Sequence, residues 1–572
     1  MSVINQALSL LALSFAALLV VNHPASAATC ESLTGVQLPH ARVTTAESIT
    51  GGSFVPPGGS YAPPGAAQGL AGLPPFCRVV VQSTPTSDSL ISIEIWIPLG
   101  EAWNGKYEQL GCGGFCGTFQ FGGYFSLAKA VRRGYAGAIT DDGSQTGGNG
   151  SFALGHPEKI TDFGYRALKE TTDNAKGIIA ALAGKGPQRS YFNGCSDGGR
   201  EALMEAQRFP YDFDGIIVGA PANAWTHLFT GVLANEQALL DVPASYIAPA
   251  QLSIISKAAI AQCSSHDGSA PGDAFINDPL QCDFDPISVQ CKPGQNPDSC
   301  LTPLQVKAAR SIYRGPHDPY TGKPIAPGFT AGNEDDPAYW PTWITGASRE
   351  ADLRDLYTPP TLPLLPTRGA QQQFLANSFF ANFVFQNPHF DFRTVNVVTA
   401  VAAADQRVGK LINSIDPDLQ RFKSHGGKII HYHGWGDAAL APMNSVNYYN
   451  EVRDALAGTA TRDRGAASYK DVQQFYRLFM VPGMAHCGGG PGANEFGAYI
   501  DPPVVDANHD VLKALERWVE QGIAPDRIIA THYVDGNPAK GVQFQRPLCP
   551  FPQIARYDGR GDPSDANSFT CR

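Results

Sequence analysis

A serine flanked by glycines, in the stretch GCSDG, is the first candidate for chemistry in this sequence. Gly194, Ser196 and Gly198 match the pattern G-x-S-x-G, in which glycines permit a tight turn that exposes a nucleophilic serine above a sheet. The backbone amide of Asp197, at the head of the next predicted helix, can donate to a developing oxyanion. Ser196 is therefore predicted to be a nucleophile; the alternative is a structural serine that caps the helix.

A reactive serine needs a histidine to take its proton and an acid to orient that histidine. In this arrangement the acid and then the histidine follow the serine along the chain, each after a late strand. Asp437 follows the predicted strand in KIIHYHGWGD, and His486 follows the next strand in RLFMVPGMAHC. We expect both to complete a triad with Ser196, although Asp437 could instead be a loop aspartate in a turn. His431 and His433 lie within the strand and are interpreted as core or lining histidines.

The predicted nucleophile and the predicted base each have a cysteine beside them. Cys195 precedes Ser196, and Cys487 follows His486. If the serine and the histidine meet within hydrogen-bonding distance, these cysteines can reach the roughly 4.4–6.8 Å Cα separation that a disulfide requires. We predict a Cys195–Cys487 disulfide that holds the pair in register, with loop closure contributing at most about 5 kcal/mol.

Strands and helices alternate on both sides of a long interruption. From Gly105 to Pro221, short apolar segments alternate with amphipathic helices, which is typical of a parallel sheet. The alternation stops at Ala222, where prolines, cysteines and aromatic residues accumulate until roughly Pro417, and it then resumes. The prediction is an α/β fold whose catalytic domain comprises 29–221 and 418–572, with an inserted lid domain at 222–417.

The bulk composition indicates an exported, disulfide-bonded protein. The formal net charge of −10 argues against a nucleic-acid or anionic-membrane partner. An apolar run followed by ASAA predicts a signal peptide over residues 1–28, the alternative being a membrane anchor. Twelve cysteines, an even number without a CxxC pair, favour disulfides over a zinc site. We expect a secreted or periplasmic protein that binds neither nucleic acid nor a membrane.

Several motifs that together span nearly the whole mature chain resemble the tannase and feruloyl esterase family of α/β-hydrolases. They are GCGGFCG, NGCSDGGREAL, the cysteine-rich insertion, CLTPLQVKAARSIYRGP, HGWGD and PGMAHCGGG. The family has a Cys-Ser … Asp … His-Cys catalytic pattern and includes a bacterial hydrolase of mono(2-hydroxyethyl) terephthalate. The resemblance implies an α/β-hydrolase sheet with a large lid inserted between the nucleophile and the acid.

The resemblance also implies a disulfide pattern, which spacing alone cannot select. The implied pairs are Cys30–Cys77, Cys263–Cys282, Cys291–Cys300 and Cys549–Cys571. Cys112 and Cys116 are left over, and a local sixth bridge between them is expected. By the same resemblance, the Gly-rich turn after the first strand of the predicted sheet supplies a second oxyanion amide, from Gly113 or Gly114. The alternative for this stretch is an ordinary tight turn.

The family's lid usually holds a calcium ion, in a loop resembling C-D-x-x-D-G-x-x-D-G-x-I. Here Ser264 stands in place of the first aspartate, and two extra residues precede Asp273. Asp267 and Asp273 keep carboxylates, and the carbonyls of Ser269 and Phe275 could complete a set of oxygen ligands. A structural Ca²⁺ ion in the lid is therefore expected, the alternative being an acidic, solvated loop closed by its disulfide.

The resemblance implies a secreted serine esterase that releases hydroxycinnamic or gallic acids from their esters, including esters attached to plant polysaccharide or polyphenol. Aromatic residues in the lid suit ring stacking with such acids. A tannase and a terephthalate half-ester hydrolase remain open as alternatives, with Arg368 as a candidate partner for a substrate carboxylate. The non-enzyme alternative is an inert binding protein on a hydrolase scaffold, which the three chemically competent triad positions speak against.

Overall fold

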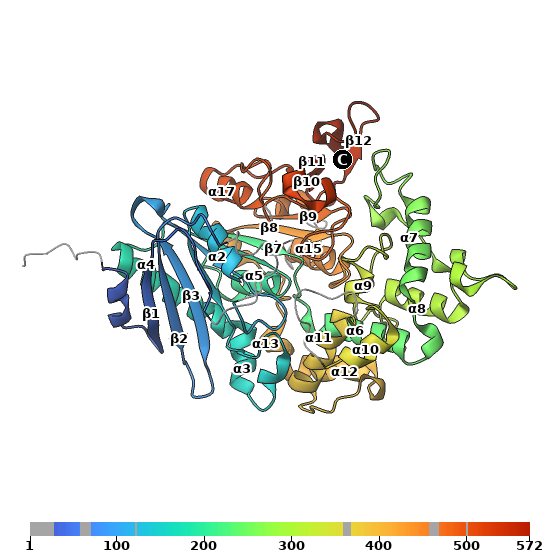
Figure 1. The fold of residues 1–572 in the computed structure, drawn as a ribbon, viewed down its shortest axis with the longest axis horizontal. Helices are drawn as coiled ribbons and strands as arrows, with labels where there is room; N and C mark the ends of the chain where they lie inside the picture. The colour runs from blue at the N-terminus through green and yellow to red at the C-terminus, as the bar shows by residue number, and fades with distance from the viewer. Residues whose placement is uncertain (1–27, 58–69, 120–122, 358–367, 457–467, 499–500) are drawn as a thin grey trace, which may run out of the picture.

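A nine-stranded sheet runs through the centre of the protein (Figure 1). The computed structural model describes residues 28–57, 70–119, 123–357, 368–456, 468–498 and 501–572, and the statements below refer to these residues. The strand order is β1-β2-β3-β5-β4-β6-β7-β8-β9. The strands are β1 (Ala41–Ile49), β2 (Phe76–Ser83), β3 (Ile91–Pro98), β4 (Lys106–Leu110), β5 (Ala136–Thr140), β6 (Arg189–Cys195), β7 (Gly215–Gly219), β8 (Lys428–Gly434) and β9 (Tyr476–Val481).

The six strands from β4 to β9 are parallel, whereas β1, β2 and β3 pair antiparallel at one end of the sheet. Every residue of β5 and β7 is buried. Continuous burial follows because helices cover both faces of a parallel sheet, and it explains why these strands are short unbroken apolar runs. The parallel α/β sheet predicted from the sequence is confirmed, and the antiparallel end was not anticipated.

Two layers of helices enclose the parallel strands. Helices α4 (Ala167–Ala183), α5 (Asp197–Arg208) and α15 (Met443–Leu456) contribute to one apolar core, and α2 (Gly123–Arg132) and α17 (Val511–Gln521) contribute to the core on the other face. Helices α4 and α17 end at Gly184 and Gly522, which adopt positive φ angles of 72° and 74°. Glycine accepts this conformation without a Cβ penalty, which explains why the two helices end at these residues.

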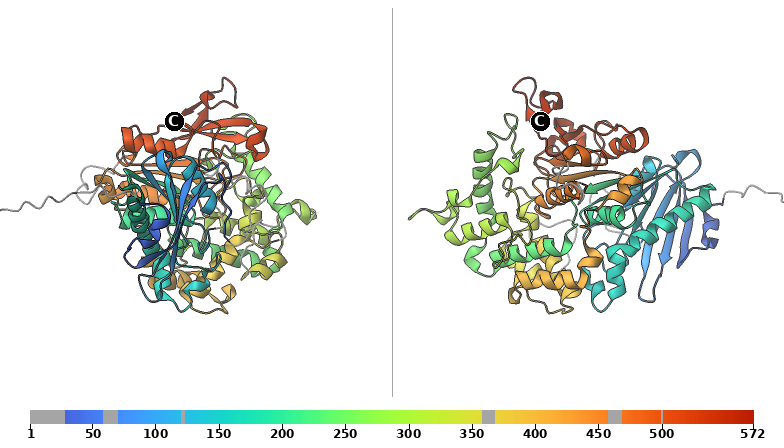
Figure 2. Two further views of the ribbon diagram at one scale, coloured as in Figure 1. Left: turned by 60° about the vertical axis from the view of Figure 1, so that its left-hand side comes forward. Right: turned by 180° about the vertical axis from the view of Figure 1, so that it is seen from behind.

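A large helical insertion leaves the sheet after β7 and returns at β8. Figures 1 and 2 show it as the green to yellow part of the chain, beside the sheet. Its longer helices are α6 (Trp225–Leu240), α7 (Pro249–Cys263), α8 (Pro303–Arg314), α10 (Arg349–Asp355), α11 (Gln371–Phe379) and α12 (Val397–Ala404). The predicted lid, 222–417, falls between these two strands.

The insertion shares an apolar core with the part of the chain that precedes it. Phe379 and Phe383 are fully buried and belong to the same core as Phe115 and Phe152. The rings of Phe115 and Phe383 are stacked with centroids 5.6 Å apart. Most lid aromatics therefore stabilise the attachment of the insertion and do not face a cavity.

None of the single helices in the described ranges is long and apolar enough to cross a membrane. Helices α6 and α7 are long and apolar enough only when taken together, and the chain bends by 106° between them. Many of their apolar side chains are buried in the core of the insertion. The predicted signal peptide, 1–28, lies outside the described residues except for its last residue.

Six disulfides join the twelve cysteines in the pattern that the family resemblance implies. They are Cys30–Cys77, Cys112–Cys116, Cys195–Cys487, Cys263–Cys282, Cys291–Cys300 and Cys549–Cys571. The local Cys112–Cys116 bridge is thus present as well. The Cys195–Cys487 bridge joins residues 292 positions apart in the sequence, whereas the other five join residues at most 47 positions apart.

Candidate active site

Ser196 occupies a sharp turn between β6 and α5. Its φ and ψ angles are 68° and −120°, a region that non-glycine residues rarely adopt. The turn is held by a 3.0 Å hydrogen bond from the Ser196 amide to the carbonyl of Gly219 on β7. A Cβ atom on Gly194 would lie 2.3 Å from the Gly198 carbonyl oxygen, so the turn requires glycine at this position. The G-x-S-x-G pattern therefore forms the strand–turn–helix unit that lifts Ser196 above the sheet.

Asp437 follows strand β8, and His486 follows strand β9. Asp437 Oδ2 accepts a 2.7 Å hydrogen bond from His486 Nδ1, and Asp437 Oδ1 accepts from the amides of Ala439 and Leu440 at 2.8 and 2.9 Å. Burial alone would raise the pKa of Asp437, but the charge on His486 and the hydrogen bonds from His433 and His486 hold this pKa below its usual value. Asp437 is therefore a permanent carboxylate that fixes the orientation of the His486 ring.

The Cys195–Cys487 disulfide joins the Ser196 turn to the His486 loop, with Cα atoms 6.0 Å apart. Ser196 and His486 line one cavity. Within the described residues no hydrogen bond joins Ser196 Oγ to His486 Nε2, and this ring nitrogen lies 3.7 Å from Cys487 Sγ. Catalytic hydrogen bonds commonly tighten only when substrate is bound. The structure thus brings the three predicted triad residues to one site.

Three residues predicted to supply oxyanion amides line the same cavity. They are Asp197, which opens α5, and Gly113 and Gly114, which lie in the turn after β4. None of their amides donates a hydrogen bond to another described residue. Free amides beside a nucleophile can stabilise an oxyanion, because they are oriented before the charge develops. The three amides are therefore unpaired at the cavity that Ser196 lines, and their role as an oxyanion hole stays a prediction.

The cavity has a volume of about 620 Å³, and the insertion forms one of its walls. That wall includes Trp225, Phe229, Trp343, Gln371 and Leu375. The ring of Trp343 meets the ring of His486 edge to face, with centroids 5.0 Å apart. Gln371 Nε2 and Trp225 Nε1 are buried and have no hydrogen-bond partner in the described part of the chain. The wall therefore combines aromatic surface with two unsatisfied donors.

One aromatic residue of the lid and the candidate partner for a substrate carboxylate do not line the cavity. Trp340 is 2% exposed and belongs to the core of the insertion, and Arg368 is not among the described residues that line the cavity. His431 is fully buried between Tyr476 and Ser445, as expected of a core histidine.

His433 has a role that the sequence did not reveal. This residue is fully buried, and its Nε2 lies 3.1 Å from Asp437 Oδ2, so it contacts the predicted acid from behind. Its Nδ1 lies 2.6 Å from Ser445 Oγ. The spacing of four residues to Asp437 was a signal, but only the turn after β8 makes the contact.

The loop predicted to bind calcium is held by hydrogen bonds from the protein itself. Asp267 is 1% exposed; its Oδ1 accepts from the Ser269 amide at 3.0 Å, and its Oδ2 accepts from the Asn277 amide at 2.5 Å. Ser264, at the position of the first aspartate, donates its hydroxyl to Ile260 O at 2.8 Å. Phe275 lies nearby with its side chain 2% exposed.

Arg546 supplies a positive charge to this loop. It lies on β11 (Val542–Leu548), and its Nη2 is 2.5 Å from Asp273 Oδ1, while Asp273 Oδ2 accepts from the Ala270 amide at 2.8 Å. All four carboxylate oxygens of Asp267 and Asp273 therefore accept a hydrogen bond from another group of the protein. Calcium needs several carboxylate or carbonyl oxygens directed at one point. The residues present do not fit a calcium ion, because a guanidinium already pairs with Asp273.

The chain is similar to known proteins over nearly its whole length. A family model described as tannase and feruloyl esterase matches residues 77–572. An uncharacterized esterase of Xanthomonas campestris is 42% identical over 559 residues, covering 96% of this chain and 91% of that protein. A mono(2-hydroxyethyl) terephthalate hydrolase of Piscinibacter sakaiensis is 31% identical, covering 88% and 86%. The crystal structure of feruloyl esterase B from Aspergillus oryzae superposes with a TM-score of 0.80 at 27% identity, covering 95% of this chain and 99% of that one.

Proposed function

Because the chain belongs to the tannase and feruloyl esterase family, and is thus a carboxylic ester hydrolase, we propose that Ser196, Asp437 and His486 are its catalytic triad. We further propose that its substrates are esters of hydroxycinnamic acids. The observation that carries the assignment is the 2.7 Å contact between His486 Nδ1 and Asp437 Oδ2 beside the disulfide that ties the histidine loop to the Ser196 turn.

The first step of the proposed reaction acylates the serine. Ser196 Oγ attacks the ester carbonyl carbon while His486 Nε2 accepts the hydroxyl proton. The charge that develops on the carbonyl oxygen is stabilised by the amide of Asp197 and by the amides of Gly113 and Gly114. His486 then donates its proton to the departing alcohol, and the acyl group remains on Ser196.

The second step releases the acid. A water molecule gives a proton to His486 and attacks the acyl carbon, and the same amides stabilise the second oxyanion. Ser196 leaves as its oxygen recovers the proton from His486. Asp437 stays ionised throughout, since its role is to orient the ring and stabilise the imidazolium.

The cavity wall supports an aromatic acyl group with neutral ring substituents. Trp225, Phe229 and Trp343 offer surfaces for stacking, and Gln371 Nε2 offers a donor to a phenolic or methoxy oxygen. Among the described residues, the part of the wall contributed by the insertion contains no lysine or arginine. Outside the insertion, Lys129, Arg132 and Arg133 also line the cavity, and Lys129 and Arg133 pair with Asp501. The aromatic wall of the insertion favours a hydroxycinnamate. A terephthalate half-ester, whose carboxylate would need one of these cations as a partner, is an alternative. A gallate ester remains the second candidate, because its hydroxyls suit the donor of Gln371.

We also propose that the protein acts outside the cytoplasm, on aromatic esters that include those attached to plant polysaccharide or polyphenol. Six disulfides support this location, because disulfides form and persist in oxidising compartments.

The test compares the wild type with Ser196→Ala. Labelling by a fluorophosphonate probe and hydrolysis of methyl ferulate, methyl gallate, chlorogenate and a terephthalate half-ester are measured for each. The wild type should be labelled and should have its highest kcat/KM on a hydroxycinnamate, whereas the variant should lose labelling and at least about 10³-fold in kcat. Undiminished hydrolysis by the variant, with thermal unfolding unchanged, would end the assignment of Ser196. An unlabelled wild type that cleaves no ester would support the inert binding protein.

A further inference from the structure

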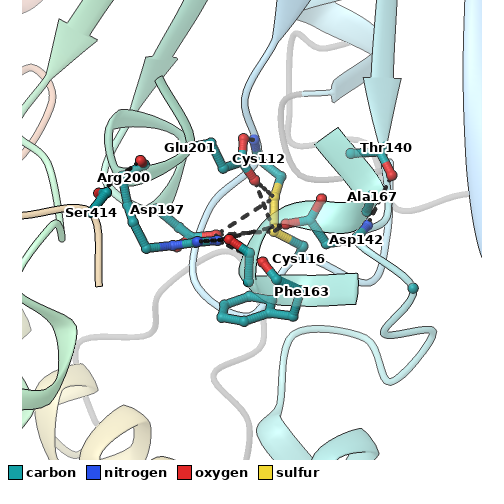
Figure 3. Close-up of polar contacts among 12 residues, drawn as sticks. Cys112, Cys116, Thr140, Asp142, Phe163, Ala167, Asp197, Arg200, Glu201 and Ser414 are labelled. Carbon is teal, nitrogen blue, oxygen red and sulfur yellow. Dashed lines mark hydrogen bonds and ion pairs between the residues drawn. A yellow bond between two sulfur atoms is a disulfide. The ribbon is translucent and has the colours of Figure 1, made fainter. Parts of the chain in front are cut away.

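Three carboxyl groups and one guanidinium lie close to the Cys112–Cys116 disulfide, near the start of α5, which follows Ser196 (Figure 3). They are Asp142, Asp197, Glu201 and Arg200, and none is more than 1% exposed. The carboxylate oxygens and the sulfurs of Cys112 and Cys116 lie within 4.8 Å of one another. The sulfurs of Cys112 and Cys116 are bonded to each other and are not thiolates, so only the three carboxylates could bind a metal ion. The guanidinium of Arg200 already supplies a positive charge to them. These groups form a buried acid network at the base of the proposed active site.

Arg200 satisfies one of the three acids. Its Nε donates to Asp197 Oδ1 and its Nη2 to Asp197 Oδ2, the latter at 3.1 Å. Its other donor bonds go to the carbonyls of Gly164 and Phe163 at 2.8 and 2.9 Å. Arg200 Nη2 is 3.8 Å from Asp142 Oδ2, which is beyond hydrogen-bonding distance. One guanidinium thus neutralises Asp197, and the remaining pair, Asp142 and Glu201, must be stabilised in another way.

Burial and neighbouring charges make Asp142 and Glu201 harder to ionise. As a carboxylate, Asp142 would leave its buried Oδ1 without a donor among the described residues. Burial and the charges of Glu201 and Asp197 raise the pKa of Asp142 well above its usual value, and burial and the charge of Asp197 raise the pKa of Glu201 to about 7. These shifts reduce the negative charge that the site must hold beside Asp197.

Glu201 in turn holds the turn that carries the proposed oxyanion donors. Its Oε2 accepts a 3.2 Å hydrogen bond from the amide of Cys112, and the carbonyl of Cys112 accepts from the amide of Gly198 at 2.8 Å. A Cβ atom on Gly111 would lie 2.5 Å from Gly198 Cα and 2.8 Å from Glu201 Oε2. The turn after β4 is thus packed backbone to backbone on the first turn of α5, and Glu201 supplies the side-chain bond between them.

We propose that Glu201 is a positioning residue for the oxyanion hole. By accepting from the Cys112 amide, it keeps the amides of Gly113 and Gly114 directed at the same point as the amide of Asp197. The inference rests on the proposed function, since an oxyanion forms only if Ser196 attacks an ester.

The test deletes the acceptor without creating a cavity. Glu201→Met keeps the length of the side chain and removes its charge, and replacing buried ionic groups by apolar ones of similar volume is often neutral or stabilising. The expected result is a fall in kcat of about 10- to 100-fold with KM changed less than about 3-fold, because the donors are displaced and their loss alone costs about 10²–10³. The rate of phosphonylation by a fluorophosphonate should fall in parallel, since that reaction develops charge on the same oxygen.

Glu205 provides the matched control. It lies one turn further along α5, is fully buried, and its two carboxylate oxygens have no hydrogen-bond partner in the described residues. Glu205→Met should leave kcat and the phosphonylation rate within about 2-fold of the wild type. Glu201→Gln should restore kcat to within about 3-fold, because its amide oxygen can still accept from Cys112.

Three outcomes would overturn the inference. The first is a folded Glu201→Met variant with the kcat and the phosphonylation rate of the wild type. The second is an equal loss in Glu205→Met, which would show a general effect of altering α5. If Glu201→Met does not fold, Glu201→Gln decides, and a loss of 10-fold or more in that variant would be the third. Failure of the proposed function is separate, because the wild type itself would then neither hydrolyse the esters nor react with the probe.

Discussion

Cys195 and Cys487 are joined by a disulfide although they lie 292 positions apart in the sequence, and each is the immediate neighbour of a proposed catalytic residue. The bond connects the turn after β6 to the loop after β9, and β7 and β8 lie between these two strands in the sheet. Because each cysteine is bonded directly to a proposed catalytic residue, the disulfide limits how far the serine hydroxyl and the imidazole can move apart.

Removing this bond should affect both activity and stability. The double variant Cys195→Ala/Cys487→Ala is expected to lose about 2–4 kcal/mol of unfolding free energy, because the unfolded chain gains freedom, and its kcat should fall because the His486 loop can shift. Denaturant unfolding and kcat on an aromatic ester measure the two effects. Cys291→Ala/Cys300→Ala, which opens a disulfide within the insertion, should lower stability without changing kcat. A Cys195/Cys487 variant that behaves as the wild type would show that the bond is incidental.

Gln371 should contribute to selectivity for the acyl ring. Gln371→Leu removes one of the unpartnered donors from the cavity wall. A neutral hydrogen bond is worth about 0.5–1.5 kcal/mol, so kcat/KM for methyl ferulate should fall roughly 3- to 10-fold. Methyl cinnamate, which lacks oxygen substituents on its ring, is the matched substrate. The variant and the wild type should hydrolyse it with the same kcat/KM. Equal losses on both substrates would instead indicate a general distortion of the wall.

The insertion loop should depend on Arg546 and not on calcium. Chelation with EDTA should leave the thermal unfolding temperature unchanged, since the carboxylates of Asp267 and Asp273 already have donors. Arg546→Gln should destabilise the protein by roughly 3–5 kcal/mol, because it leaves a buried carboxylate unpaired. Arg310→Gln, which breaks an exposed pair with Asp285, should change stability much less, because solvent screens an exposed pair. A clear drop in unfolding temperature on chelation, reversed by added Ca²⁺, would contradict this account.

Asp352 should make stability fall as the pH rises. It is 1% exposed on α10, and burial raises its pKa to about 8. Because the unfolded value is near 3.9, the folded state binds more protons between these two values, and its stability decreases with pH across that window. Asp352→Asn should make the slope less steep by at most about 1.4 kcal/mol per pH unit, the contribution of one proton.

The measurement is denaturant unfolding at several pH values between 5 and 8. Asp355→Asn is the control, because the hydrogen bond from Arg354 lowers the pKa of Asp355 and removes its titration from this window. A wild-type slope identical to that of Asp352→Asn would show that Asp352 does not carry a proton in the folded state.

Short segments of the sequence contained enough information to predict several parts of this structure. The strand–turn–helix unit around Ser196 follows from local rules, because glycine and the apolar pattern act within a few residues. The same is true of the parallel strands β6 to β9 and of the glycine ends of α4 and α17. The positions of Asp437 and His486 could be predicted because parallel strands direct their carboxyl ends to one edge of the sheet.

Contacts between distant segments could not be predicted in this way. Trp340 and Trp343 are three residues apart, yet only Trp343 reaches the cavity, because the packing of the insertion against the sheet decides which ring is enclosed. The meeting of His433 with Asp437, the pairing of Arg546 with Asp273 and the burial of Glu201 beneath the nucleophile turn are of the same kind. The sequence alone determined which groups are available for chemistry, since residue type and local spacing suffice for that. Only the tertiary structure decided which of them lose water and gain a partner, because desolvation and hydrogen bonding depend on neighbours from other parts of the chain.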